Sequence, residues 1–297
     1  MLGGFGHKTL LVSALALSGP ACLASGARPL ITSPKNALVK ALRRLESKRH
    51  REREGLMVCE GLRLVCDALE AGFEAETVLV AEPLLAEQPR LRRLLDQLAP
   101  GVVLLADEAV LAAASTTVTA QGIVGAVRMP PPVTQLPDGA TFVLVLDNVQ
   151  DPGNVGTLVR CAAGFGCDAV VSLGNCADVW GPKALRSAMG GTFRVPVVEA
   201  SDWAELRESL TRNELRIYAA DGGLAARDYA TVDWRQPSAV IVGNEANGLS
   251  DAIRADVADG KIGVVCIPMA AELESLNAAM AGTVLLSECS RQRRESR

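Results

Sequence analysis

The sequence predicts an α/β protein of two domains, because short apolar runs of strand length alternate with segments whose apolar residues recur at helical spacing. Its 297 residues are enough to bury two cores, and 49% of them are apolar while only 3% are aromatic, so we expect cores of Ala, Leu and Val. Prolines gather at Pro130-Pro131-Pro132 and again at Pro137-Asp138-Gly139. Because prolines extend the chain and remove hydrogen-bond donors, residues 128–140 are predicted to link the two domains.

The composition excludes several classes of function. The net charge of −4 argues against bulk attraction to nucleic acid, so any contact with RNA must come from a local basic surface. The only histidines are His7 and His50, so the rest of the chain lacks a Ser-His-Asp triad, a histidine base and an imidazole-bound metal. The eight cysteines contain no C-x-x-C pair, which predicts reduced, buried thiols and no metal site, as for Cys59, Cys66, Cys161 and Cys266.

Residues 1–27 are predicted to be a removable targeting segment. They contain no acidic residue, and their apolar block, Leu10–Leu17, is too short to cross a bilayer, so we predict no membrane span. Because the remaining chain lacks disulfide spacing, we favour an organellar address, plastid or mitochondrion, over secretion. The alternative is a wrongly assigned start codon, in which case the protein is cytoplasmic.

A helix rich in basic residues is predicted to open the first domain, which spans residues 30–127. Ser33-Pro34-Lys35-Asn36 supplies a cap residue and a proline for its start. A charge run often marks nothing more than a solvated helix face. In an acidic protein, however, a surface of one sign favours contact with RNA phosphates. The candidate RNA-binding residues are Lys35, Arg43, Arg44, Lys48, Arg49 and Arg51.

The rest of the first domain alternates between the two kinds of element. We expect strands at residues 56–59, 77–81, 102–105 and 121–127, and helices at residues 60–71 and 91–98. This pattern predicts a small α/β domain with a core of its own.

The second domain, residues 141–290, begins with a βαβ unit. Phe142–Leu146 is a continuous apolar run typical of a buried parallel strand, and Ala169–Leu173 is the next such run. Between them, Asp151-Pro152-Gly153-Asn154 predicts a sharp turn into a helix, with Asn154 as the N-cap candidate. Backbone amides at such a turn suit an anionic group, yet the glycines match neither the dinucleotide fingerprint nor a P-loop.

Further segments continue the alternation. We expect helices at residues 182–189 and 202–212, strands at 193–198, 216–220, 239–242 and 264–267, and a long helix that begins near residue 274. The last helix is rich in small residues, which permit another segment to approach closely. Residues 291–297 form a basic tail.

Three separated segments together resemble the motifs of one enzyme family. The first is Asn148-x-x-Asp151-Pro152-Gly153-Asn154-Val155-Gly156 with Arg160, the second is Val242-Gly243-Asn244-Glu245-x-x-Gly248-Leu249, and the third is Ile267-Pro268-Met269 with Ser275-Leu276-Asn277. In order and spacing they resemble the three motifs of the SpoU (TrmH-type) RNA ribose methyltransferases of the SPOUT superfamily. The segment Ser33–Ala71, with Glu60-Gly61-x-Arg63, resembles the small ribosomal-protein-like domain of rRNA-directed members.

The resemblance implies an RNA 2′-O-methyltransferase. Members bind S-adenosylmethionine, have a mostly parallel sheet flanked by helices with a deep trefoil knot, and act as homodimers. The expected reaction is methyl transfer to a ribose 2′-hydroxyl of structured RNA, most often large-subunit rRNA. By resemblance the catalytic residues are Arg160, Asn154, Glu245, Asn277 and Ser275. The cofactor-binding residues are Gly243, Asn244, Ile267, Met269 and Leu276, and Arg63, Arg186 and Ser187 join the RNA-binding set.

The role expected of Arg160 is limited by its chemistry. A guanidinium keeps its proton near neutral pH and is therefore a poor general base, so we expect Arg160 to hydrogen-bond the ribose oxygen or the adjacent phosphate. Glu245 is expected to hold the site loop or to orient Arg160. Asn154 is expected to cap its helix and to contact RNA or substrate as well, and Asn277 either caps the last helix or contacts the reacting ribose. Ala278-Ala279-Met280 departs from the usual Val-Ser-Val, which removes one hydroxyl and leaves Ser275 as the nearer one.

Three alternatives stay open at this point. A tRNA ribose methyltransferase is disfavoured by the separate N-terminal domain. An RNA-binding or ribosome-assembly protein without catalysis is disfavoured by the presence of Arg160, Glu245 and Asn277. A nicotinamide-dependent oxidoreductase is disfavoured by the missing glycine fingerprint.

Overall fold

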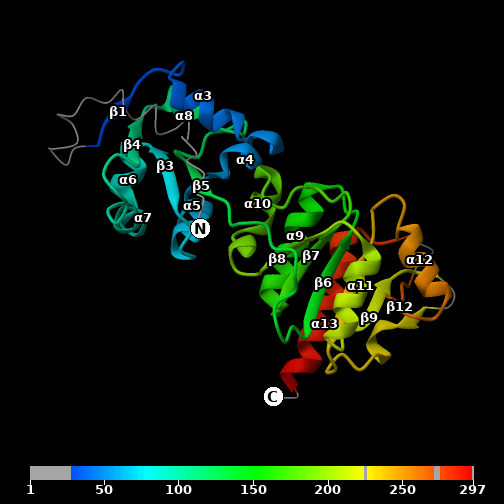
Figure 1. Cartoon of the computed structure of the whole chain (residues 1–297). Coiled ribbons are helices and arrows are strands. Elements are labelled where there is room, and N and C mark those ends of the chain that lie inside the picture. The colour runs from blue at the N-terminus through cyan, green and yellow to red at the C-terminus, as the bar shows by residue number, and fades with distance from the viewer. Residues whose placement is uncertain (1–27, 224–225, 271–274, 296–297) are drawn as a thin grey trace, which may run out of the picture. The chain divides into compact units, whose positions relative to one another are not determined.

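The computed structural model describes residues 28–223, 226–270 and 275–295, and the chain divides into two compact units (Figure 1). The N-terminal unit holds residues up to 130 together with 180–182, and the C-terminal unit holds residues 131–179 and those from 183 onward. The predicted targeting segment lies outside the described residues. The predicted α/β class is confirmed, whereas the trefoil knot stays a prediction.

The N-terminal unit is built on a mixed five-stranded sheet, in the order β1-β4-β3-β5-β2. β5 is antiparallel to both β2 and β3, and the other pairs are parallel. The strands are β1 (Leu30–Ile31), β2 (Leu56–Glu60), β3 (Ala75–Val80), β4 (Val103–Ala106) and β5 (Ile123–Arg128). The helices are α3 (Ala37–Arg44), α4 (Lys48–Glu54), α5 (Leu62–Glu70), α6 (Glu82–Glu87), α7 (Pro89–Leu95) and α8 (Glu108–Ala114). The sequence did not predict β1, α6 or α8, which are too short to show a clear period.

The basic segment at the start of this unit forms two helices, where the sequence predicted one. Asn36, and not Ser33, caps α3, since its side chain accepts a hydrogen bond from the N–H of Leu38 at 2.8 Å. A corner separates α3 from α4, and Gly55 ends α4 with a φ of 65°, which favours glycine.

The prediction that Arg51 belongs to the RNA-facing surface is wrong. Arg51 is only 3% exposed, and its guanidinium donates to the carbonyl oxygens of Leu45 at 2.8 Å and Glu46 at 2.7 Å. Both carbonyls lie just past the end of α3, where helix carbonyls lack partners and attract positive charge. Arg51 therefore holds the corner between the two helices.

The C-terminal unit has a parallel seven-stranded sheet in the order β10-β12-β9-β11-β6-β7-β8. Its strands are β6 (Phe142–Asp147), β7 (Ala169–Leu173), β8 (Val197–Ala200), β9 (Arg216–Ala220), β10 (Arg227–Asp228), β11 (Ser238–Val242) and β12 (Gly263–Cys266). The α-helices are α9 (Pro152–Phe165), α10 (Pro182–Ala188), α11 (Trp203–Arg212), α12 (Asp251–Ala258) and α13 (Ala278–Glu295). Short 3₁₀ turns occupy η1 (Gly191–Phe193) and η2 (Tyr229–Thr231).

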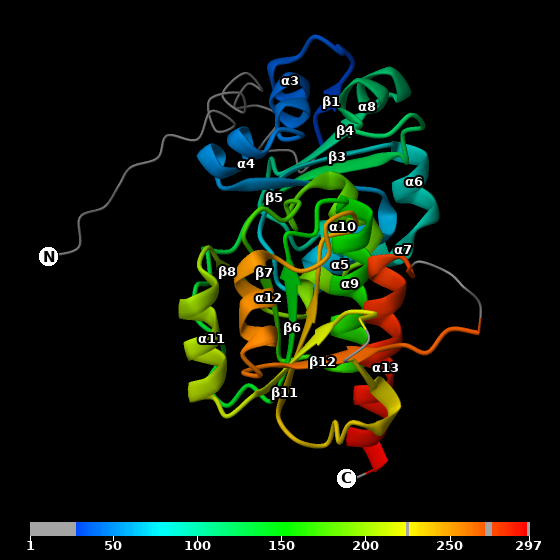
Figure 2. The ribbon, with the colours of Figure 1, turned by 90° about the vertical axis from the view of Figure 1, so that its right-hand side faces the viewer.

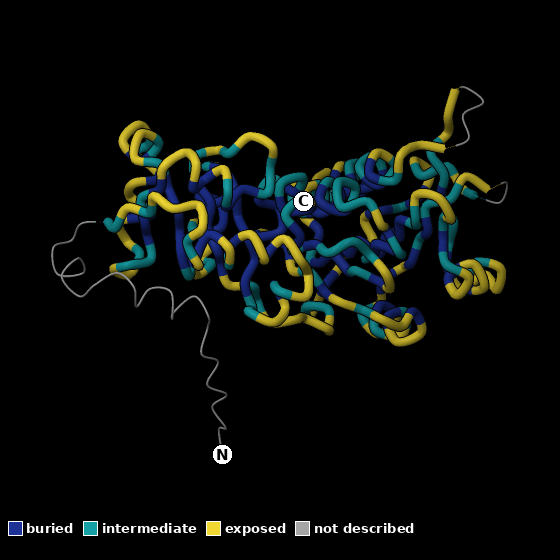
Figure 3. Tube along the Cα trace, turned by 90° about the horizontal axis from the view of Figure 1, so that it is seen from above, coloured by how far each residue is buried: buried dark blue, intermediate teal, exposed yellow. Residues whose placement is uncertain are grey.

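Helices cover both faces of this sheet, as the apolar strands require. Along β6, Phe142, Leu144 and Leu146 enter one core cluster, and Val143 and Val145 enter the other. Figure 2 shows α9 and α13 on one side of the sheet and α11 and α12 on the other. The central strands β6 and β11 are buried along their whole length, and Figure 3 shows buried stretches of the trace with exposed stretches around them.

The prediction of a strand over residues 193–198 is wrong for residues 193–196. Phe193 ends the 3₁₀ turn η1, and β8 begins only at Val197. Pro196 interrupts the apolar run, because a proline lacks the N–H that a strand interior needs. The seven described cysteines are free thiols, as predicted, although Cys161 and Cys266 are only partly buried.

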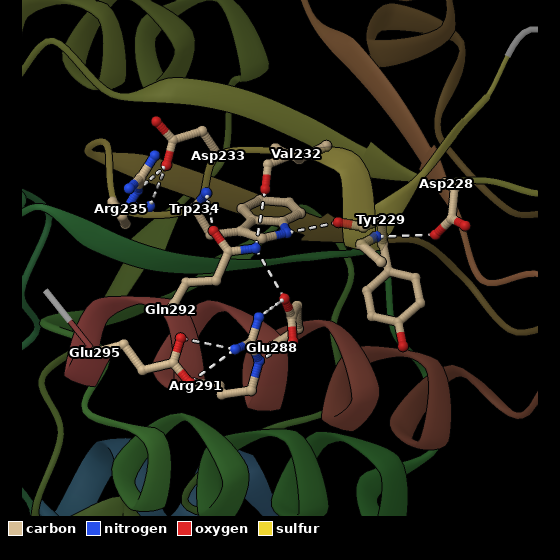
Figure 4. A network of polar contacts seen from close by, with 11 residues as sticks. Asp228, Tyr229, Val232, Asp233, Trp234, Arg235, Glu288, Arg291, Gln292 and Glu295 are labelled. Atoms are coloured by element: carbon tan, nitrogen blue, oxygen red, sulfur yellow. Dashed lines mark hydrogen bonds and ion pairs between the residues drawn. The ribbon is translucent and has the colours of Figure 1, made fainter.

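The crossover between β10 and β11 is tied to α13 by a polar network (Figure 4). The Gln292 side chain accepts from the N–H of Trp234 at 2.9 Å and donates to the carbonyl of Val232 at 3.0 Å and to Glu288 at 2.8 Å. The indole N–H of the fully buried Trp234 donates to the carbonyl of Tyr229 at 2.8 Å. The last helix is therefore fixed along its C-terminal half.

Two glycines allow helices to pack unusually close in the C-terminal unit. A Cβ added at Gly156 on α9 would lie 2.3 Å from the carbonyl oxygen of Ala184 on α10. A Cβ added at Gly282 on α13 would lie 2.3 Å from a methyl carbon of Leu158 on α9. Both contacts are closer than real Cβ atoms adopt, so α9 is confined between α10 and α13.

We predict that Gly156→Ala lowers the free energy of unfolding by about 1–3 kcal/mol, because the new methyl group must displace helix backbone. Gly164→Ala, on the same helix but with open space around it, is the matched control, and we expect it to change stability by less than about 1 kcal/mol or to raise it. Urea titrations of both variants measure the difference. Equal stability of the two would contradict the close approach of α9 and α10.

Candidate active site

The three predicted motifs meet at the carboxyl ends of the C-terminal unit's strands. The first follows β6, the second follows β11, which pairs with β6, and the third follows β12, two strands further along the sheet. Carboxyl ends of parallel strands are where open α/β sheets bind their ligands. The order of strands therefore places all three motifs at one edge.

A pocket of about 770 Å³ opens at this edge, within the size range of small-molecule sites. Its walls come from the end of β9, the second motif and the third motif. They include all five predicted cofactor-binding residues, namely Gly243, Asn244, Ile267, Met269 and Leu276, and three of the predicted catalytic residues, namely Glu245, Ser275 and Asn277. Asn154 and Arg160 do not line this pocket.

The second motif forms a turn that only glycine permits. A Cβ added at Gly243 would lie 2.6 Å from the carbonyl carbon and oxygen of Gly248. Asn244 and Gly248 exchange two backbone hydrogen bonds of 2.8 and 2.9 Å, and Gly248 has a φ of 68°. This turn brings the backbone of Gly243 and Gly248 together at the pocket wall.

Asp147, at the end of β6, joins the first motif to the second, a role that the sequence analysis missed. Its fully buried carboxylate accepts from the N–H of Ser250 at 2.6 Å and from the Asn148 side chain at 2.8 Å. The Asn244 side chain donates to the carbonyl of Asn148 at 2.8 Å. The sequence signal for this role was an acidic residue at the end of an otherwise apolar strand.

A chain of hydrogen bonds through Glu245 connects all three motifs. Its carboxylate accepts from the N–H of Gln150 at 3.1 Å, from the N–H of Asp151 at 3.0 Å and from the Asn154 side chain at 2.9 Å. The Asn277 side chain donates to the amide oxygen of Asn154 at 3.1 Å. Glu245 therefore holds the loop that follows β6, and Asn154 lies between Glu245 and Asn277.

The environment of Glu245 keeps it ionised. Partial burial raises the pKa of this carboxyl, but the hydrogen bonds from the Asn154 side chain and from the backbone of Gln150 and Asp151 lower it by more, so it lies below its usual value. A carboxylate committed to three donors is a poor proton acceptor. Glu245 is thus placed to position other groups.

The prediction that Asn154 caps α9 is wrong. Asp151 is the cap, since its side chain accepts from the N–H of Asn154 at 3.0 Å. A hydrogen bond from Lys183 at 2.9 Å holds the pKa of Asp151 below its usual value. Because Asp151 occupies the cap, the Asn154 side chain can link Glu245 to Asn277.

Asn277 does cap its helix, α13, one of the two roles expected for it. Its amide oxygen accepts from the N–H of Ala279 at 2.9 Å and of Met280 at 3.2 Å. Its NH₂ group is directed to Asn154. Ser275, two residues earlier, is exposed at the pocket wall.

Arg160 is exposed on α9 and makes no hydrogen bond or ion pair with the residues that the structure describes. It lies six residues beyond Asn154, about 9 Å along the helix axis. Its backbone packs on η1, since a Cβ added at Gly191 would lie 2.9 Å from the Arg160 Cα. The Arg160 guanidinium is therefore available to a ligand, but Arg160 does not line the pocket of its own chain.

The remaining predicted RNA-binding residues lie in both units. In the N-terminal unit the exposed members are Lys35, Arg43, Arg44, Lys48, Arg49 and Arg63. Lys48 forms a weak, exposed ion pair with Glu52 at 3.7 Å, and Arg63 lies 3.6 Å from the buried carboxylate of Asp67, each within its own helix. In the C-terminal unit Arg186 and Ser187 are partly buried on α10, where Ser187 packs against α9 beside Gly156.

The described residues lack two kinds of feature. They contain no group of three or more His, Cys, Asp or Glu side chains arranged to hold a metal ion. Among the described helices, none combines the length and the apolar character that a bilayer crossing requires.

Comparison with known proteins gives a family for both units. Residues 141–287 match the SpoU rRNA Methylase family, and residues 36–125 match the MRM3-like substrate binding domain. The chain is similar to rRNA methyltransferase 3A, mitochondrial, of Danio rerio, with 33% identity covering 86% of this chain and 68% of the relative. It is also similar to the 23S rRNA (guanosine(2553)-2′-O)-methyltransferase RlmP of Bacillus subtilis, with 32% identity covering 86% and 97% of the two chains.

A solved structure shares the architecture. The crystal structure of the SpoU methyltransferase AviRb from Streptomyces viridochromogenes, in complex with the cofactor AdoMet, has a TM-score of 0.75 and 27% identity, covering 88% of this chain and 100% of that one. The predicted parallel sheet flanked by helices is confirmed by this likeness. Because it spans 97% of a relative at 32% identity and residues 141–287 match the family, the chain belongs to the SpoU rRNA methylase family.

Proposed function

We propose that the protein transfers the methyl group of S-adenosylmethionine to a ribose 2′-hydroxyl of ribosomal RNA. The main support for this proposal is the pocket between the second and third motifs. Hydrogen bonds between Glu245, Asn154 and Asn277 connect these two motifs to the first motif. The relatives named as rRNA methyltransferases support rRNA over tRNA as the substrate. The uncommitted Arg160 supports an active enzyme over an RNA-binding protein that has lost catalysis.

The residues divide the task between them. When bound, S-adenosylmethionine supplies a methyl group on a sulfonium, which is electrophilic. Gly243, Ile267 and Leu276 hold it through backbone groups and apolar contact. Arg160 binds the ribose oxygen or the adjacent phosphate and stabilises the negative charge that develops as the hydroxyl proton passes to solvent water. Glu245 keeps the first motif's loop in place while this happens.

A homodimer is the second part of the proposal. Arg160 lies outside the pocket of its own chain, so another surface must complete the site. Leu276 and Met269 are 38% exposed and Met280 is 60% exposed, and all three lie in or next to the third motif. Apolar side chains grouped around a pocket mouth are typical of a covered surface. We propose that a second copy covers them and that the chain forms the trefoil knot of its family.

The exposed cations of α3 and α4 form the proposed RNA surface of the N-terminal unit. Beside them, the buried Glu60 accepts from the N–H and the hydroxyl of Thr116, both at 2.8 Å, and from the hydroxyl of Thr117 at 2.6 Å. Arg43 donates to the carbonyl of Ser115 at the start of the same loop. This rigid loop and the neighbouring cations suit a folded RNA, which is recognised largely by shape and backbone.

An organellar location stays a proposal, with a plastid or a mitochondrion as the compartment. Its support is the composition of residues 1–27 and the mitochondrial relative of Danio rerio.

The proposed reaction is tested with purified protein, tritiated S-adenosylmethionine and unmodified rRNA. We expect wild type to label the RNA and Arg160→Ala to lower the rate by about 100-fold to 1,000-fold, because one stabilising donor is lost. Calorimetry is expected to give unchanged cofactor affinity for this variant. Arg212→Ala, an exposed arginine on α11, is the control. Full activity of Arg160→Ala would disprove its role.

Glu245→Gln tests the positioning role. We expect amide exchange at Gln150 and Asp151 to become about tenfold faster at pH 7, because hydrogen bonds to a charged acceptor are lost. Since the folded pKa of Glu245 is lowered, its contribution is present above the unfolded pKa of about 4.3 and is lost as the pH falls through the folded value. Below the folded pKa of Glu245, amide exchange at Gln150 and Asp151 should therefore be equally fast in wild type and variant. Glu208→Gln on α11 is the control, and equal exchange in both variants would contradict the role.

Arg44→Ala combined with Arg49→Ala tests the RNA surface. We expect weaker rRNA binding and a salt dependence of log K shallower by about two, because two phosphate contacts disappear. Arg92→Ala with Arg93→Ala removes two exposed arginines from α7 and serves as the control. An unchanged salt slope in the first double variant would place the RNA elsewhere.

A further inference from the structure

Within the described parts of the chain, the pocket wall includes two acidic residues and no basic one. Among the described residues of its wall, Asp221 and Glu245 are the only charged side chains. Such a wall carries a negative potential that a partly enclosed site strengthens, because little water screens it. It therefore favours a ligand that carries net positive charge.

The two carboxylates are not equivalent. Glu245 is committed to three donors of the first motif. Asp221 accepts a hydrogen bond from the N–H of Gly223 at 3.0 Å, through one oxygen only, and no other partner among the described residues is found for its side chain. Asp221 thus retains acceptor capacity for a ligand.

The backbone holds Asp221 in place at the pocket wall. The residue directly follows β9, and its N–H donates to the carbonyl of Val265 on β12 at 3.0 Å. β9 lies between β11 and β12, which lead into the second and third motifs. Asp221 therefore lies at the carboxyl end of the strand between those that lead into the two cofactor-binding motifs, although it belongs to neither motif.

The possible ligands differ in charge in a way that matters here. S-adenosylmethionine carries a sulfonium, an ammonium and a carboxylate, and so has a net positive charge. Its product, S-adenosylhomocysteine, has a neutral thioether and no net charge. Sinefungin has the shape of the cofactor and carries a protonated amine in place of the sulfonium methyl.

We propose that Asp221 is a cofactor-binding residue that makes the pocket prefer the cationic donor over the neutral product. The preference follows from charge, since the carboxylate attracts a positively charged ligand and gains nothing from a neutral one. Loss of the positive charge on methyl transfer then weakens binding of the product and promotes its release. The inference rests on the proposed function, because it assumes that the pocket binds S-adenosylmethionine.

The test is calorimetry of the full chain with S-adenosylmethionine, S-adenosylhomocysteine and sinefungin. For Asp221→Asn, which keeps the size and the hydrogen bond of the side chain, we expect about tenfold weaker binding of the two cationic ligands. We expect the affinity for S-adenosylhomocysteine to change by less than about twofold, which also shows that the pocket is folded. Asp138→Asn, an exposed turn residue outside the pocket, is the matched control and should change no affinity.

Each other outcome has a definite meaning. Equal loss for all three ligands overturns the inference, because Asp221 would then recognise a part that they share, such as the ribose hydroxyls. Unchanged affinities for all three also overturn it. If the wild-type protein binds none of them, the proposed function itself fails. Failure of the inference and failure of the function are thereby distinguished.

Discussion

The arrangement of this active site depends on one ionised carboxylate, that of Glu245. It gathers two backbone N–H groups and one side-chain amide from the loop after β6. That amide belongs to Asn154, whose oxygen in turn accepts from Asn277 at the start of α13. Three segments that are far apart in the sequence thus share a single chain of hydrogen bonds, so displacing one of them disturbs all three.

Close packing between helices supports this chain of hydrogen bonds. Gly156 lets α10 approach α9, and Gly282 lets α13 approach α9 from another side. The Trp234 and Gln292 network then fixes the far half of α13 to the crossover before β11. Because α9 and α13 are each held at more than one point, Asn154 and Asn277 at their N-terminal ends have little freedom, and the hydrogen bond between them can form without a large loss of entropy.

In both units a carboxylate at or near the end of a strand holds a loop through hydrogen bonds. In each, a carboxylate at or just after the end of a strand accepts several hydrogen bonds from one loop, Glu60 in the N-terminal unit and Glu245 in the C-terminal unit. Burial raises the pKa of both carboxyls, and the hydrogen bonds lower it by more. Each loop is therefore rigid at neutral pH and carries the groups proposed to meet substrate or cofactor.

The sequence by itself determined the α/β class, the parallel sheet and the family, because continuous apolar strands and three motifs at fixed spacing are local signals. Only the tertiary structure decided which polar groups are shared. Arg51 lies in a basic run, yet it turns inward to the free carbonyls at the end of α3. Asp151 takes the cap that the sequence assigned to Asn154, and Asp221 reaches the pocket through the order of the strands. Arg51 and Asp151 bond to groups three to six residues away, so their partners depend on how the chain turns there, whereas Asp221 is placed by the packing of distant strands, which no local pattern encodes.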